Sequence, residues 1–185
     1  MEAEDGLIAR TLAGDLEAYA LLVDRYRASV FSLAYRMTGS RDRADDVAQD
    51  AFLRAHNALG SFDRQRPFRP WLLAITANLC KEDLRRRARS GEEELPEELP
   101  AARPEGPDDP YEAAQREETQ QMVHRALSRL PETQRLVTIL VYLQGMSHEQ
   151  VSEMLGQPVN TVKSHAHRAR ARLRQLLAPH AEVTA

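Results

Sequence analysis

Five basic side chains and no acidic one lie between Thr161 and Arg174, in the last third of this 185-residue chain. They are Lys163, Arg168, Arg170, Arg172 and Arg174. Lys and Arg neutralise phosphates, and this supplies most of the sequence-independent affinity of proteins for DNA. A solvated, arginine-rich terminal helix is the alternative, but a merely solvated face normally mixes acids with its bases. These residues therefore predict nucleic acid as the leading partner.

Two helices joined by a short turn are predicted to position these bases. Ser147 and Gln150 have the spacing of a capping box, which begins a helix, and Gly156 lies where a helix ends in a left-handed turn. After Pro158, apolar residues recur at steps of three and four: Val162, Ala166, Ala169, Leu173 and Leu176. At about 100° per residue, the opposite face carries Asn160, Ser164 and His167, flanked by Lys163 and Arg168. This pattern is typical of a helix-turn-helix whose second helix enters the major groove of DNA.

The acidic charge of the chain is concentrated in one segment. Residues 91–118 hold eleven acids and two bases, although the whole chain has a formal net charge of only −3. Five prolines also fall between residues 90 and 110. Proline and like charge together favour an extended, unpacked linker. We therefore predict an all-α protein of two small helical domains, 1–90 and 119–185, joined by a flexible acidic linker over 91–118 that runs into the first helix of the second domain.

The first domain is predicted to be helical throughout. Apolar periodicity and the glycines predict helices over 7–13, 15–38, 42–59 and about 71–89, with a loop over 60–69. No alternating apolar pattern of strand type is present, and no apolar run approaches the ~20 residues of a membrane span. One cysteine, Cys80, cannot form an internal disulfide, and the acidic N-terminus lacks the features of a secretory signal. These observations indicate a cytoplasmic protein.

The sequence contains none of the common catalytic motifs. It has no Cys-x-x-Cys pair, no His-Glu-x-x-His and no glycine-rich phosphate loop. His165 and His167 diverge by about 200° on a helix, so they are not a metal pair. We expect no enzyme activity, no metal and no cofactor.

Two stretches resemble a known family. Asp45-Asp-Val-Ala-Gln-Asp-Ala-Phe-Leu-Arg-Ala55 and Pro67-Phe-Arg-Pro-Trp-Leu-Leu-Ala-Ile-Thr-Ala-Asn78 are similar to region 2 of bacterial sigma factors. Leu130-Pro-Glu-Thr-Gln-Arg-Leu-Val137 and the helix-turn-helix resemble region 4. With only these two regions and a short linker, the chain resembles the extracytoplasmic-function (ECF) sigma factors over roughly residues 5–178. The resemblance implies a subunit that binds core RNA polymerase, directs it to promoters and helps to melt the DNA, in a stress response.

The resemblance also assigns residues. Those matching the motif that docks on the clamp helices of the largest polymerase subunit are Asp45, Asp46, Gln49, Asp50 and Phe52. Phe52 is expected to be an apolar anchor in a polar rim, whereas the aspartates would also suit the positive end of a helix. Those matching the part that melts and reads the −10 element are Ser61, Phe62, Arg64, Phe68, Trp71, Asn78, Lys81 and Arg85. Aromatic and cationic side chains bind opened single strands, but the three aromatic residues would equally suit a core.

In region 4 the residues expected at the −35 element are Asn160, Thr161, Lys163, Ser164, His167 and Arg168. The family usually has Gly-Thr-Val-Lys-Ser-Arg here, so Asn160 and His165 depart from its pattern. The resemblance further implies contact with the polymerase flap, an acidic linker that threads the cationic cleft of the polymerase, and an anti-sigma partner. A solubilising spacer is the alternative for the linker. An ordinary helix-turn-helix regulator is the alternative for the whole chain, and no obligate homo-oligomer is expected.

Overall fold

The computed structural model describes residues 3–91 and 110–181, and every regular element in these two segments is helical. This agrees with the all-α prediction. The helix α5 (Pro110–Ser128) begins inside the stretch predicted to be linker, so the end of that stretch is helical. The rest of the predicted acidic linker, 92–109, lies outside the described residues.

The first lobe consists of α1 (Glu4–Leu12), α2 (Leu16–Thr38), α3 (Arg41–Ala58), the short turn η1 (Leu59–Ser61) and α4 (Phe68–Ser90). Local sequence explains where α2 begins and ends. The Asp15 carboxylate accepts hydrogen bonds from the Glu17 and Ala18 amides at 3.0 and 3.1 Å, which caps the helix. Gly39, at a φ of 76°, ends it in the left-handed conformation that glycine adopts without strain. Leu22, Val30 and other apolar residues of α2 then pack against α3 and α4.

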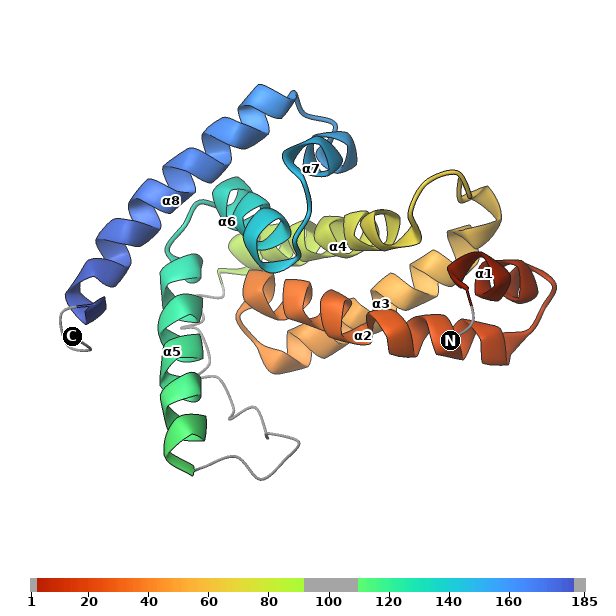
Figure 1. Ribbon diagram of the computed structural model, residues 1–185, viewed down its shortest axis with the longest axis horizontal. Helices are drawn as coiled ribbons and strands as arrows, with labels where there is room; N and C mark the ends of the chain where they lie inside the picture. Colours follow the sequence, from red (N-terminus) through yellow and green to blue (C-terminus); the bar gives the residue numbers. More distant parts are fainter. Residues whose placement is uncertain (1–2, 92–109, 182–185) are drawn as a thin grey trace.

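The second lobe consists of α5, α6 (Glu132–Thr138), the π-helical turn η2 (Ile139–Leu143), α7 (His148–Leu155) and α8 (Val159–Ala181). The sequence did not predict η2. It follows α6 without a break and is capped at its end by Gln144, three residues before the helix-turn-helix begins at Ser147. In Figure 1, α6 and α7 lie between the first lobe and α8, and the long α8 runs along the outside of the molecule.

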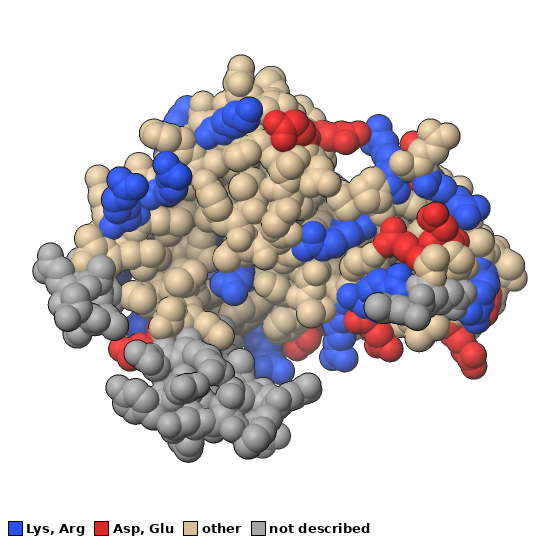
Figure 2. All heavy atoms as spheres, viewed as in Figure 1, with Lys and Arg blue, Asp and Glu red and all other residues tan. Residues whose placement is uncertain are grey.

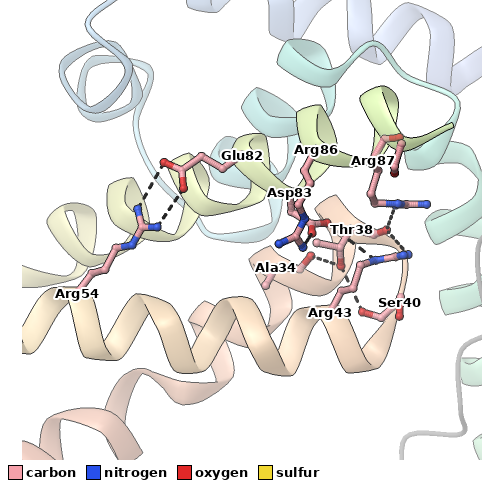
Figure 3. Close-up of polar contacts among 10 residues, drawn as sticks. Ala34, Thr38, Ser40, Arg43, Arg54, Glu82, Asp83, Arg86 and Arg87 are labelled. Atoms are coloured by element: carbon pink, nitrogen blue, oxygen red, sulfur yellow. Dashed lines mark hydrogen bonds and ion pairs between the residues drawn. The ribbon is translucent and has the colours of Figure 1, made fainter. Parts of the chain in front are cut away.

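Three arginines from different helices meet the C-terminal end of α2. The Thr38 carbonyl accepts hydrogen bonds from Arg43 of α3 at 3.3 Å and from Arg87 of α4 at 3.4 Å (Figure 3). The neighbouring Met37 carbonyl accepts one from Arg135 of α6 at 2.9 Å. The last carbonyls of a helix lack intrahelical partners and carry partial negative charge, so guanidinium groups are favoured there. These contacts join α3, α4 and the second lobe to the C-terminal end of α2.

The two lobes share one core in this structure. Their buried side chains form a single continuous hydrophobic cluster, and α7 packs against α4 while α5 and α6 pack against α2. His124 of α5 stacks on Tyr35 of α2 with ring centroids 5.0 Å apart. The chain therefore folds into two lobes in direct contact.

Candidate nucleic-acid interface

The helix-turn-helix begins with the capping box that the sequence predicted. The Ser147 hydroxyl accepts a hydrogen bond from the Gln150 amide at 3.1 Å, and the Gln150 side chain accepts one from the Ser147 amide at 2.9 Å. Gly156 ends α7 with a φ of 63°, and the Ser152 hydroxyl donates to the Gln157 carbonyl across the turn. These local bonds fix the angle at which α8 leaves α7.

The helix α8 separates a buried face from a basic exposed face, as predicted. Val162, Ala166 and Ala169 are at most 2 % exposed. The predicted DNA-facing residues are all exposed: Asn160, Thr161, Lys163, Ser164, His167 and Arg168. His165, where the family usually has arginine, is only partly exposed, and its Nδ1 is buried without a hydrogen-bond partner. His165 is therefore turned away from the exposed face.

The charge on α8 is available to a ligand. The described part of α8 carries no acidic residue, and Lys163 meets only the Glu149 carboxylate of α7, at 3.8 Å. Both side chains are more than half exposed, and such pairs contribute at most about 1 kcal/mol. Figure 2 shows Lys and Arg side chains on the α8 side of the molecule, at the upper left, and a denser mixture of both signs over the first lobe.

The aromatic residues near the predicted −10 loop form a cluster. Phe62 and Phe68 meet edge to face with centroids 5.5 Å apart, and Trp71 lies 4.9 Å from Phe62 and 5.4 Å from Phe68. Phe62 is 8 % exposed and Phe68 is 1 % exposed, whereas Trp71 is partly buried. The burial of Phe62 and Phe68 supports the structural one of the two roles considered for them, because a buried ring offers no free face for base stacking. The cluster holds the 61–69 loop on the lobe.

The polar residues predicted for the −10 strand are all exposed or partly exposed. Ser61 and Arg64 are exposed in the loop, and Asn78 and Arg85 are exposed on α4, with Lys81 partly exposed between them. The opposite face of α4 is core, with Leu72 and Leu79 at most 5 % exposed. The helix α4 thus has a buried face and a polar, exposed face.

The acidic stripe on α3 is also exposed. Asp45, Asp46, Gln49 and Asp50 all face solvent. Phe52, the predicted anchor, is partly buried against the core, and its carbonyl accepts a hydrogen bond from the Tyr19 hydroxyl. Leu53 is 56 % exposed instead. Leu53 follows Gln49 by four residues, so the helical period places both on one face. Leu53 was not named from the sequence, although this spacing could have identified it.

A groove of about 560 Å³ runs beside this stripe, between α3 and α4. Asp46, Gln49 and Asp50 line one side of it, and Glu82, Arg86 and Arg89 line the other. Arg54 and Glu82 bridge it with N–O distances of 3.0 and 3.4 Å (Figure 3). Asp83, 6 % exposed, accepts a hydrogen bond from Arg86 at 2.6 Å and lies 3.9 Å from Arg43. The Arg54–Glu82 and Arg43–Asp83 pairs thus join α3 to α4.

A second groove, about 230 Å³ and apolar, opens on the second lobe. It is lined by Val123 and Leu127 of α5, Tyr142 and Leu143 of η2, and Leu173 and Leu177 of α8. Tyr142 is 50 % exposed and Leu143 is 43 % exposed. Exposed apolar residues gathered in a groove are typical of a protein-binding surface.

The described residues offer no metal site, since no three His, Cys, Asp or Glu side chains in them come together as ligands. Burial raises the pKa of the Cys80 thiol to about 12, which makes it an inert core residue. None of the helices in the described segments combines the length and apolar content that a membrane crossing needs.

Comparisons with known proteins agree with this arrangement of the chain. The family model for sigma-70 region 2 matches residues 22–90, and that for sigma-70 region 4 matches residues 120–173. The ECF RNA polymerase sigma factor SigW of Bacillus subtilis (strain 168) is 34 % identical over 183 residues, covering 92 % of this chain and 94 % of that protein. The ECF RNA polymerase sigma-E factor of Escherichia coli (strain K12) is 35 % identical over 170 residues, covering 89 % and 88 %.

Solved structures give the same result. The structure of CnrH in complex with the cytosolic domain of CnrY superposes with a TM-score of 0.70 at 30 % identity, covering 96 % of this chain and 99 % of CnrH. The sigma factor RpoE of Bartonella quintana, bound to the anti-sigma factor NepR, gives a TM-score of 0.71 at 25 % identity, covering 86 % and 96 %.

Proposed function

The chain belongs to the ECF sigma factors of the sigma-70 family, and from this membership and its surfaces we propose which residues perform each step of transcription initiation. As a sigma factor it directs RNA polymerase to promoters. An ordinary helix-turn-helix regulator would need only the second lobe, whereas the family match extends over both lobes. The chain is not itself a catalyst in this proposal, because the polymerase forms the phosphodiester bonds.

The second lobe reads the −35 element through α8. Lys163 and Arg168 neutralise phosphates on either side of the groove, and Asn160, Ser164 and His167 lie nearest the base edges. Their exposure on one face, opposite the buried Val162, supports this assignment. Phosphate contacts set the register of the helix and base contacts give sequence preference.

The first lobe binds the opened −10 strand. Asn78, Lys81 and Arg85 of α4 hold the strand, and Ser61 and Arg64 offer further contacts from the loop. The buried Phe62 and Phe68 act on DNA only indirectly, by fixing that loop, while the partly buried Trp71 has surface left for a base. Base stacking on an aromatic ring contributes about 1–3 kcal/mol, enough to offset the unstacking of one base.

The stripe on α3 docks on the polymerase clamp helices. Asp46, Gln49 and Asp50 provide the polar rim, and the exposed Leu53 takes the role of apolar anchor for which Phe52 was the sequence candidate. An apolar side chain inside a polar rim is the usual arrangement of a binding hot spot. The apolar groove beside Tyr142 is the candidate contact for the polymerase flap.

Three further assignments rest on the family alone. We propose that an anti-sigma protein holds this chain inactive, as the solved complexes of similar proteins suggest. The chain then acts in the cytoplasm, where polymerase and DNA are, and its release is part of a stress response.

The observation that carries the proposal is the presence, in one chain and in this order, of an exposed docking stripe, a polar −10 face and a basic recognition helix. The test is run-off transcription with core polymerase on promoters enriched from genomic DNA with tagged protein. We expect specific transcripts that depend on this chain. Transcripts no more abundant than with core polymerase alone would refute the proposal.

A further inference from the structure

Gln144 joins three helical segments at the contact between the lobes. Its side chain is 7 % exposed. Its Oε1 accepts a hydrogen bond from Arg69 Nη2 of α4 at 2.6 Å, and its Nε2 donates to the Ser29 carbonyl of α2 at 3.1 Å. Both polar atoms of the amide are therefore satisfied by the first lobe, although Gln144 belongs to the second.

Side chains of the second lobe also bind two arginines of the predicted −10 loop. Arg69, bonded to Gln144, is the last residue of the predicted loop, and Arg66 in the same loop pairs with Glu153 of α7 at 3.0 Å. The Arg66–Glu153 pair is more than half exposed, so it contributes little to stability. It still places a carboxylate of the second lobe against a basic side chain of the predicted −10 loop.

The contact has a second half around α5. Arg135 of α6 donates to the Met37 carbonyl at 2.9 Å, and His124 stacks on Tyr35. Gln144 and Arg135 thus hold the second lobe at two separate places along α2, which prevents it from pivoting about either one.

This arrangement is incompatible with reading two promoter elements at once. The centres of the −10 and −35 elements are about 25 base pairs apart, or roughly 85 Å at about 3.4 Å per base pair. Here α7, which carries α8, packs directly on α4, the helix proposed to bind the −10 strand. The lobes have to separate before α4 and α8 reach their two elements.

We propose that the contact between the lobes is a self-inhibited resting state of this protein and that Gln144 is its latch. The inference rests on the proposed function, because the inhibited step is the seating of both lobes on polymerase and promoter. A chain that is binding-competent only when open has an apparent affinity reduced by its open fraction. The closed form therefore weakens binding to a promoter that carries both elements, without any partner protein.

Removing the latch is expected to open the chain. Gln144→Ala deletes one hydrogen bond to a charged guanidinium and one to a carbonyl, which raises the ratio of open to closed molecules about tenfold to hundredfold. Gln120→Ala is the matched control, because Gln120 is exposed on α5. Spin labels on Asn57→Cys of α3 and Gln175→Cys of α8 report the lobe separation by double electron–electron resonance, and the buried Cys80 stays unlabelled.

We expect a single narrow distance distribution in the wild-type background and in Gln120→Ala, and an added broad component at longer distances in Gln144→Ala, because the Arg135 and His124 contacts remain. Circular dichroism checks that the helices are kept. An unchanged distribution in a folded Gln144→Ala chain would overturn the latch.

The second measurement concerns inhibition itself. Arg66→Cys/Glu153→Cys, joined by a bismaleimide whose spacer contains a disulfide, locks the lobes at an exposed pair. Fluorescence anisotropy of a promoter that carries both elements, titrated with core polymerase and this chain, should show binding at least tenfold weaker for the locked chain, recovered on reduction, and tighter than wild type for Gln144→Ala. A locked chain that binds this promoter with wild-type affinity would overturn self-inhibition. Run-off transcription by the wild-type chain tests the proposed function separately, so the two failures are distinguishable.

Discussion

Alanine substitutions at two neighbouring residues of α3 are expected to have different effects, one on polymerase binding and the other on stability. Phe52 is partly buried against the core, whereas Leu53 is 56 % exposed on the face that carries Gln49. Leu53→Ala is therefore expected to weaken polymerase binding with little effect on stability. Phe52→Ala is expected to destabilise the first lobe.

The magnitudes follow from the exposed areas. Full burial of a leucine side chain contributes about 1.5–3 kcal/mol, and a little over half of Leu53 remains to be buried on docking. Leu53→Ala should then cost about 1–1.5 kcal/mol of binding free energy, or roughly tenfold in Kd. Its effect on the free energy of unfolding should stay within about 0.5 kcal/mol, as for other surface substitutions. Phe52→Ala leaves a cavity and should cost about 2–3 kcal/mol of stability, below the range for fully buried phenylalanine.

The assay pairs urea unfolding with titration of core polymerase followed by fluorescence anisotropy. Leu21→Ala is the matched control, because Leu21 is 47 % exposed and lies about 160° around α2 from Tyr19, which contacts α3. It should leave both quantities unchanged. The reasoning is refuted if Leu53→Ala binds polymerase like the wild type, or if Phe52→Ala weakens binding without lowering stability.

Two further predictions concern DNA and pH. Arg168→Ala should weaken binding to all promoters alike and lower the slope of log K against log salt concentration by about one unit. Ser164→Ala should instead change the base preference at one −35 position. If both substitutions weakened binding uniformly across a promoter library, these roles would be contradicted. Burial, with Arg36 and Arg135 nearby, lowers the pKa of His124 below its ordinary value of 6.5. Because the unfolded chain then binds the proton more readily, the free energy of unfolding should fall as pH drops below about 6.5, by at most about 1.4 kcal/mol per pH unit. His124→Phe keeps an aromatic ring against Tyr35 but does not titrate. It should therefore remove this dependence of the free energy of unfolding on pH, measured by urea unfolding. An unchanged dependence would show that another group titrates.

Local sequence signals predicted the helix-turn-helix well. The capping box at Ser147, the left-handed Gly156 and the two faces of α8 depend on residues within a few positions of one another. The same holds for the two faces of α4. Such features are set by the helical period and by capping groups, which a single sequence displays directly.

The remaining features depend on contacts between distant residues. Gln144 meets Arg69 and Ser29 across 75 and 115 positions, and nothing local distinguishes it from an exposed glutamine. The roles of Phe62 and Phe68 were open in the sequence, because an aromatic ring suits a core and a DNA-binding loop equally. Their mutual packing with Trp71, which the sequence does not display, supports the structural role. Phe52 was the sequence candidate for the apolar anchor, and its partial burial became visible only from the packing of α3 on α2. Its role in polymerase docking stays a prediction, beside that of the exposed Leu53.

Permanganate footprinting of the promoter complex tests the central claim most directly, because only a sigma factor is expected to open the DNA. With wild-type chain and core polymerase, thymines near the start site should become reactive. Asn78→Ala/Lys81→Ala should suppress this reactivity while duplex binding through α8 is kept, and Asn57→Ala, an exposed asparagine on α3, should behave like the wild type. A holoenzyme that binds the promoter and leaves its thymines unreactive would contradict the account.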